Sequence, residues 1–180
     1  VKKIKFAVQG FGNVGSFAAK FLSEAGARLV AISDSRGVVY NEKGIDFKKL
    51  ENIKRKEGSV TKYPGKVFPG HDILKVKADV LVTAAVPDLI GAGDVDNIKA
   101  KVVVEGSNIP TTPDVEDLMH KKGILVVPDF VANAGGVISS YVEYIGGNEK
   151  RMFRMVEEKI KRNTKAVLDN AEKKNTKPRD

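Results

Sequence analysis

Short apolar runs recur along the chain, and most of them are uniformly apolar rather than alternating. They are rich in Val and Ile and are bounded by Gly, Pro or Asp, which is typical of β-strands. Because nearly every position in these runs is apolar, we expect parallel strands that are covered on both faces. The predicted strands span residues 3–9, 28–34, 79–84, 101–106 and 124–129.

Helical patterns lie between these runs. Between the first two, apolar residues from Val14 to Ala25 recur every three or four positions and form one helical stripe, and Gly26 follows as a stop signal. Similar patterns predict helices over residues 46–57 and 113–122. Alternating strands and helices imply right-handed βαβ units. The predicted fold is therefore α/β: a Rossmann-like, doubly wound, mostly parallel sheet with helices on both faces.

Two segments depart from this alternation. Residues 58–75 are rich in Gly and Pro and predict a long surface connection that could include a short strand. Apolar residues at helical spacing over residues 149–175 predict a long amphipathic C-terminal helix, following a core of about residues 1–145. We expect both parts to belong to one domain over residues 1–180.

Charge changes this picture little. The formal net charge is +8, and residues 150–180 carry 11 Lys and Arg against 5 Asp and Glu. The basic excess therefore belongs mainly to the C-terminal helix, where it is interpreted as a solvated face. Nucleic-acid binding is the alternative, but that segment lacks interleaved aromatic residues and any recognisable module. We expect no nucleic-acid partner.

Composition excludes several kinds of site. The 180 residues contain no Cys, which rules out disulfides, thiolate zinc sites and cysteine nucleophiles. His71 and His120 have no partner at metal-ligand spacing, so we expect no metal. No signal peptide is recognisable, and no apolar run approaches the roughly 20 residues that span a bilayer. These features favour a cytoplasmic protein with no membrane contact.

The stretch VQGFGNVG, residues 8–15, contains a GxGxxG pattern between a predicted strand and a predicted helix. In that context Gly10 permits a tight turn, Gly12 lets the backbone approach a pyrophosphate, and Gly15 lets the helix pack against the strand. The amides of Asn13 and Val14 then point at the phosphate from the helix N-terminus. The pattern therefore predicts a dinucleotide-binding loop.

Asp34 lies 19 residues after Gly15, at the end of the second predicted strand, where the adenosine ribose would lie. A carboxylate there favours the free 2′-hydroxyl of NAD. Ser35 and Arg36 follow directly and could bind the 2′-phosphate of NADP if Asp34 turned away. We therefore expect NAD or NADP, with a slight preference for NAD.

Three segments that follow predicted strands carry candidate binding residues, because ligands of doubly wound sheets lie at the carboxyl ends of the strands. TAAVP, residues 83–87, is small and apolar and suits a ribose-binding surface. Asn108 and Asn133 follow two later strands, and their carboxamides could pair with the carboxamide of nicotinamide. The alternative is that both asparagines are turn residues or helix caps.

Four stretches in this order, VQGFGNVG, SDSRG, VVVEGSNIPTTP and ILVVPDFVANAGGVISSYVEY, resemble the glutamate dehydrogenases of the Glu/Leu/Phe/Val dehydrogenase family. The resemblance runs from Val1 to about Tyr144 and more loosely to the end. It covers only the cofactor-binding domain, and it implies oxidative deamination of L-glutamate to 2-oxoglutarate and ammonia, with hydride transfer to nicotinamide C4. Ser107 and Ile109 depart from the family's usual Ala and Gly.

The resemblance also assigns roles to residues. Val137 and Ser140 match positions at the side-chain end of the substrate pocket, and a Ser hydroxyl there suits a γ-carboxylate, which favours glutamate over leucine, valine or phenylalanine. The matching cofactor-binding residues are Gly10, Phe11, Gly12, Asn13, Val14, Gly15, Asp34, Ser35, Ala84, Ala85, Asn108 and Asn133.

The family's catalytic lysine, in a GGxKG-type motif, and its proton-transferring aspartate belong to an N-terminal substrate domain. Neither motif occurs in residues 1–180, so we expect no catalytic residue here and cofactor binding without turnover. The family pattern implies a homo-hexamer for the full-length protein. Two alternatives remain: the cofactor domain of a leucine, valine or phenylalanine dehydrogenase, and a non-catalytic NAD-sensing domain.

Overall fold

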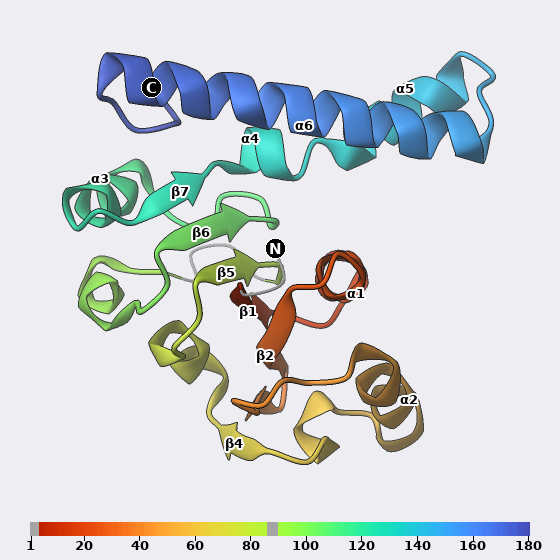
Figure 1. Ribbon diagram of the computed structural model, residues 1–180, viewed down its shortest axis with the longest axis vertical. Helices are drawn as coiled ribbons and strands as arrows, with labels where there is room; N and C mark the ends of the chain where they lie inside the picture. Colours follow the sequence, from red (N-terminus) through yellow and green to blue (C-terminus); the bar gives the residue numbers. More distant parts are fainter. Residues whose placement is uncertain (1–3, 86–89) are drawn as a thin grey trace.

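Seven strands form one sheet in the computed structural model, which describes residues 4–85 and 90–180 (Figure 1). Their order across the sheet is β4-β3-β2-β1-β5-β6-β7. The expected α/β, doubly wound and mostly parallel architecture is confirmed. The strands are β1 (Lys5–Gln9), β2 (Arg28–Asp34), β3 (Gly37–Tyr40), β4 (Lys66–Phe68), β5 (Val80–Thr83), β6 (Val102–Glu105) and β7 (Leu125–Val127).

The five predicted strands are the parallel ones, and β1 lies at the centre between β2 and β5. β3 is additional, whereas β4 is the short strand that residues 58–75 could include, and both pair antiparallel at one edge. The expected surface connection over residues 58–75 contains β4 and two 3-10 helices, η1 (Val60–Lys62) and η2 (Gly70–Lys75). The apolar runs that predicted β5, β6 and β7 extend beyond these short strands, whereas β3 and β4 are closely bounded by Gly, Asn and Pro and give no such run.

Two apolar clusters cover the two faces of the sheet. On one face α1 (Asn13–Glu24) and α2 (Phe47–Glu57) pack over β1 and β2 through residues such as Ala19 and Leu50. On the other face lie η2, η3 (Ala92–Asn97) and α3 (Pro113–Lys121). Figure 1 shows these two sets of helices on opposite sides of the strands.

The stripe that predicted α1 is only partly buried. Gly15 and Ala19 face the sheet, whereas Phe17 and Phe21 are 54% and 49% exposed and stack on each other with ring centroids 5.9 Å apart. Small residues form the buried face because α1 approaches the strands closely. The stripe thus predicts the helix correctly but not which of its faces is buried.

Three helices complete the chain beyond β7: α4 (Asp129–Ala132), α5 (Gly135–Tyr144) and α6 (Glu149–Lys174). The long α6 packs along α4 and α5, at the end of the molecule nearest β7 (Figure 1). Asn148 caps α6 by accepting a hydrogen bond from the Arg151 amide at 2.9 Å. No helix in the described residues is long and apolar enough to cross a membrane.

Candidate functional site

Of the three glycines in the loop between β1 and α1, only Gly12 has space around it for a side chain or a ligand. Gly10 has φ +99°, and its amide donates to Ser33 Oγ at 3.0 Å. A Cβ at Gly15 would lie 2.0 Å from Gly10 O, so the first and third glycines are needed for the loop to close. At Gly12, the N-cap of α1, a Cβ would meet nothing within 4 Å. The N-terminus of α1 therefore faces open space, as an anion-binding site requires.

Two neighbouring hollows lie at the carboxyl ends of the strands, and Ala84 and Ala85 line both. The first, of about 500 Å³, is bounded by the glycine loop, Ser33, Asp34, Ser35 and Lys54. Val86 and Pro87 of the TAAVP stretch lie outside the described residues. The second hollow has a volume of about 430 Å³, and its lining residues are Val14, Ala84, Ala85, Gly106, Ser107, Asn108, Asn133 and Gly136.

Most of the predicted cofactor-binding residues therefore meet in one continuous region. Phe11 lines the first hollow with the first two glycines of the motif, and Val14 lines the second. Gly15 is buried beneath the loop, and Asn13 is exposed where α1 begins. The two hollows share Ala84 and Ala85 and lie at the carboxyl ends of the strands, where ligands of doubly wound sheets bind.

Asp34 ends β2, as expected, but its carboxylate is used entirely within the chain. Oδ1 accepts from the Arg36 amide at 2.9 Å and from Ser59 Oγ at 3.2 Å. Oδ2 accepts from Lys54 Nζ and from the Val60 amide, both at 2.8 Å. Burial opposes ionisation, but these four bonds together hold the pKa of Asp34 below its ordinary value. A carboxylate offers about four acceptor positions, so Asp34 has none left for a ribose hydroxyl.

The two asparagines predicted from strand ends meet in the second hollow. Asn133 Nδ2 donates to Asn108 Oδ1 at 2.7 Å, although the residues are 25 positions apart. Asn133 also ends α4, where its amide donates to Asp129 O at 2.8 Å, so the capping alternative is correct in part. Beside them, Ser107 Oγ is buried and has no hydrogen-bond partner in the described part of the chain. A polar ligand in this hollow could form the hydrogen bond that Ser107 Oγ lacks.

The loop that carries Asn108 is supported by a buried carboxylate that was not predicted from the sequence. Glu105 ends β6 with a fully buried side chain and accepts from Thr111 Oγ1 at 2.9 Å and from the Asp129 amide at 3.0 Å. Burial raises the pKa of Glu105, and the nearby charge of Glu116 acts in the same direction. The sequence gives one indication that Glu105 is buried and paired: it is a charged residue that directly follows three valines in a predicted strand.

Other residues in the site were also missed. Gln9 ends β1 and is buried, and its Oε1 accepts a hydrogen bond at 3.2 Å from the amide of Ala84, which lines both hollows. Lys54 reaches the first hollow from α2, twenty positions after the aspartate that it contacts. Nothing in the local sequence around Lys54 distinguishes it from the other lysines of that helix.

Val137 and Ser140, matched by resemblance to a substrate pocket, lie on the exposed side of α5 and outside both hollows. Val137 is 76% exposed, and Tyr144 on the same helix is 89% exposed.

The described residues contain no group of three His, Cys, Asp or Glu side chains that could hold a metal ion. The open N-terminus of α1 and the carboxamides of Asn108 and Asn133 could bind a polar, anionic ligand.

Curated relatives of this chain are named glutamate dehydrogenases. The one from Aeropyrum pernix is 46% identical over 179 residues, covering 96% of this chain and 43% of the relative. The one from Thermotoga maritima is 50% identical over 146 residues, covering 80% and 35%. A relative from Saccharolobus shibatae, named NADP-specific glutamate dehydrogenase, is 46% identical over 138 residues, covering 76% and 33%. The chain thus spans less than half the length of the relatives that it matches.

Solved structures of such enzymes have the same fold. The hetero-hexameric glutamate dehydrogenase from Thermus thermophilus superposes with a TM-score of 0.86 at 27% identity, over 98% of this chain and 43% of that one. L-tryptophan dehydrogenase from Nostoc punctiforme gives a TM-score of 0.75 at 26% identity, over 99% and 49%. A model of the Glutamate/Leucine/Phenylalanine/Valine dehydrogenase family matches residues 1–180, and the chain belongs to that family.

Proposed function

We propose that residues 1–180 are the NAD(P)-binding domain of an amino-acid dehydrogenase, and that the dinucleotide lies across both hollows. The observation that carries this proposal is the open space at Gly12, at the N-terminus of α1 and on the edge of the first hollow. The positive end of the helix dipole favours a pyrophosphate there without any basic side chain. Adenosine would then occupy the first hollow and nicotinamide the second.

For the whole protein we propose oxidation of L-glutamate to 2-oxoglutarate and ammonia, because the relatives from Aeropyrum pernix and Thermotoga maritima carry that name. A bound nicotinamide would supply the hydride acceptor. The residues of this chain bind and orient it: the paired carboxamides of Asn108 and Asn133 lie where they could hold the carboxamide of nicotinamide. Val137 and Ser140 would reach the substrate side chain from the exposed face of α5.

The groups that transfer protons would come from outside residues 1–180, so this chain alone is proposed to bind cofactor without turnover. Because the Thermus thermophilus relative is hetero-hexameric, we further propose a hexamer for the whole protein.

Calorimetric titration of the chain with NAD and with NADP tests the binding proposal directly. We expect saturable binding of at least one nucleotide at or below about 1 mM. Heat of binding from neither nucleotide at that concentration would refute the proposal. Binding in the chain, combined with no glutamate oxidation by the whole protein, would favour the non-catalytic NAD-sensing alternative.

The choice between NAD and NADP depends on Lys54 in this proposal. Its ammonium lies on the rim of the first hollow and partly neutralises Asp34, whose acceptor positions are all used. The repulsion that a free carboxylate would exert on a 2′-phosphate is therefore reduced. We propose that the site accepts both nucleotides and that Lys54 contributes to binding the 2′-phosphate of NADP.

Replacing Lys54 with methionine is expected to weaken NADP binding by about tenfold relative to NAD binding, because it removes a cation and frees one acceptor position of Asp34. The ratio of the two dissociation constants, measured by calorimetry, is the readout. Lys56→Met, the same charge change on the exposed side of α2, is the control and should leave the ratio unchanged. An unchanged ratio in the Lys54 variant would contradict this role.

A further inference from the structure

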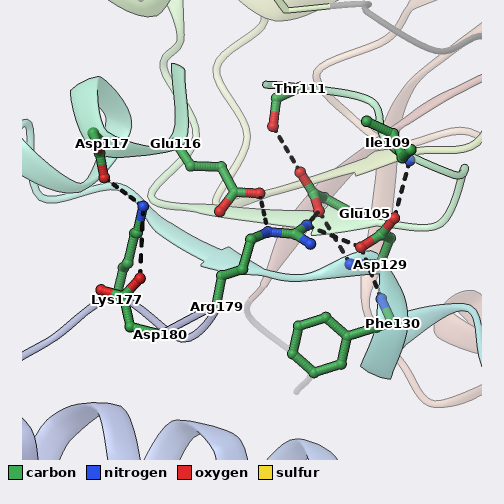
Figure 2. Close-up of polar contacts among 10 residues, drawn as sticks. All are labelled: Glu105, Ile109, Thr111, Glu116, Asp117, Asp129, Phe130, Lys177, Arg179 and Asp180. Atoms are coloured by element: carbon green, nitrogen blue, oxygen red, sulfur yellow. Dashed lines mark hydrogen bonds and ion pairs between the residues drawn. The ribbon is translucent and has the colours of Figure 1, made fainter. Parts of the chain in front are cut away.

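Three carboxylates converge on one arginine near the carboxyl ends of β6 and β7 (Figure 2). Arg179 Nη2 donates to Glu105 Oε2 at 2.7 Å and to Asp129 Oδ1 at 2.9 Å. Its Nε donates to Glu116 Oε1 at 2.6 Å. The carboxylates come from the end of β6, from α3 and from the start of α4, so one guanidinium joins three elements.

Arg179 reaches this cluster because the chain reverses after α6. Asn175 ends the helix with φ +53°, and the Thr176 amide donates back to Ala171 O at 3.0 Å. The C-terminal segment (residues 175–180) then runs back toward α3, where Lys177 contacts Asp117. The segment is thus attached at two points, one of them on the surface of α3 and one inside the carboxylate cluster.

The charges in the cluster make Arg179 difficult to replace. The side chains of Glu105 and Glu116 are 0% and 3% exposed, so water screens their mutual repulsion only weakly. Arg179 brings one positive charge against three carboxylates and reaches all three through the fixed geometry of the guanidinium. A lysine would present a single point charge and could not join the three in the same way.

The cluster is connected to the second hollow through Asp129. Its Oδ2 accepts from the Ile109 amide at 3.0 Å, while Oδ1 accepts from Arg179. Ile109 has φ +45°, a left-handed conformation that a β-branched residue adopts only when its surroundings enforce it. The residue before Ile109 is Asn108, whose side chain bonds to Asn133. The hydrogen bond from Ile109 to Asp129 therefore helps to hold the backbone that presents Asn108.

We propose that Arg179 is a positioning residue for the nicotinamide end of the cofactor: it fixes Glu105 and Asp129, and through Asp129 it holds Ile109 and Asn108 in place. This inference rests on the proposed function for the ligand, but the arrangement of the loop can be tested without one. Arg179 does not touch either hollow, so its effect is transmitted entirely through the loop that carries Asn108.

The test compares the binding of each intact nucleotide with the binding of a fragment that lacks nicotinamide. The fragment is ADP-ribose for NAD and the 2′-phosphate of ADP-ribose for NADP. In Arg179→Met we expect the dissociation constant of the intact nucleotide to rise by about tenfold, because the loop loses the ion pair that holds Asp129. The fragment should bind within about twofold of the original chain. Arg179→Lys keeps the charge, lowers the risk of misfolding, and should give an intermediate loss.

Lys177→Met is the matched control, because Lys177 lies in the same segment and its ion pairs are with Asp117 and Asp180. It should leave the dissociation constants of nucleotide and fragment unchanged. An equal loss of affinity for nucleotide and fragment in Arg179→Met, or no loss for either, would overturn the proposal.

If the original chain binds no nucleotide, the proposed function fails, and the role of Arg179 in holding the loop is tested by hydrogen exchange at the Ile109 amide. Faster exchange in Arg179→Met but not in Lys177→Met would support it, and unchanged exchange would overturn it.

Discussion

Replacing Gly15 with alanine is expected to destabilise the chain by about 3 kcal/mol or more and to abolish nucleotide binding. The added Cβ would lie 2.0 Å from Gly10 O and 2.9 Å from Gly10 C, far inside van der Waals contact. Gly10 cannot move away, because it is itself packed: a Cβ there would be 2.8 Å from Ala84 O. Helix α1 would have to separate from β1, and the glycine loop would lose its shape.

Gly12→Ala is the matched variant, because it adds the same methyl group three residues earlier. Gly12 has φ −89° and open space around it, so we expect a loss of less than about 1 kcal/mol in unfolding free energy. Nucleotide affinity should nevertheless fall by at least about tenfold, since the methyl group would occupy the space assigned to the pyrophosphate. Urea unfolding and calorimetry separate the two effects. A Gly12 variant that binds nucleotide normally would show that the phosphate lies elsewhere.

Local sequence was sufficient for the parts of the site that depend on backbone geometry. The three glycines stand between a strand and a helix, and that spacing alone predicts where the chain must turn tightly and where α1 must begin. Asn108 and Asn133 could likewise be placed together, because both follow parallel strands whose carboxyl ends share one edge of the sheet. In each case neighbouring residues carry the information.

Contacts between residues distant in sequence could not be predicted. Asp34 was expected to face a ribose, but its orientation is decided by Lys54, Ser59 and Val60, which belong to a later helix and turn. Glu105 is paired with an arginine 74 positions away. No periodicity or motif connects such residues, because the packing of the whole domain brings them together.

The second large effect is expected for Asp34→Asn, which should lower the unfolding free energy by about 2–4 kcal/mol at neutral pH. An asparagine side chain can accept hydrogen bonds only at its oxygen, so two of the four donors around residue 34 would lose their acceptor. The Lys54 ammonium would also lose the carboxylate that pairs with it at 2.8 Å. The side chain of Asp34 is only 6% exposed, so water could replace this ion pair only in part. Urea unfolding of the variant measures the loss.

A matched control for this substitution is Asp96→Asn, which removes a carboxylate paired with Lys122 on the exposed surface. The side chain of Asp96 is 84% exposed, so water already solvates both charges and the stability should not change measurably. If the two variants lose stability equally, the four bonds to Asp34 contribute no more than a surface pair does.

The loss of unfolding free energy caused by Asp34→Asn should also become smaller at low pH. Its pKa is lower in the folded chain than in the unfolded chain, so the ionised carboxylate stabilises the fold fully above its unfolded pKa near 4. That contribution disappears as the pH falls through the folded pKa, because the folded state must then also bind the proton. The difference in unfolding free energy between the original chain and Asp34→Asn should therefore stay constant from pH 7 to about 5 and narrow below about 4. A difference that persists unchanged at pH 3 would mean that shape, rather than charge, makes Asp34 important for the fold.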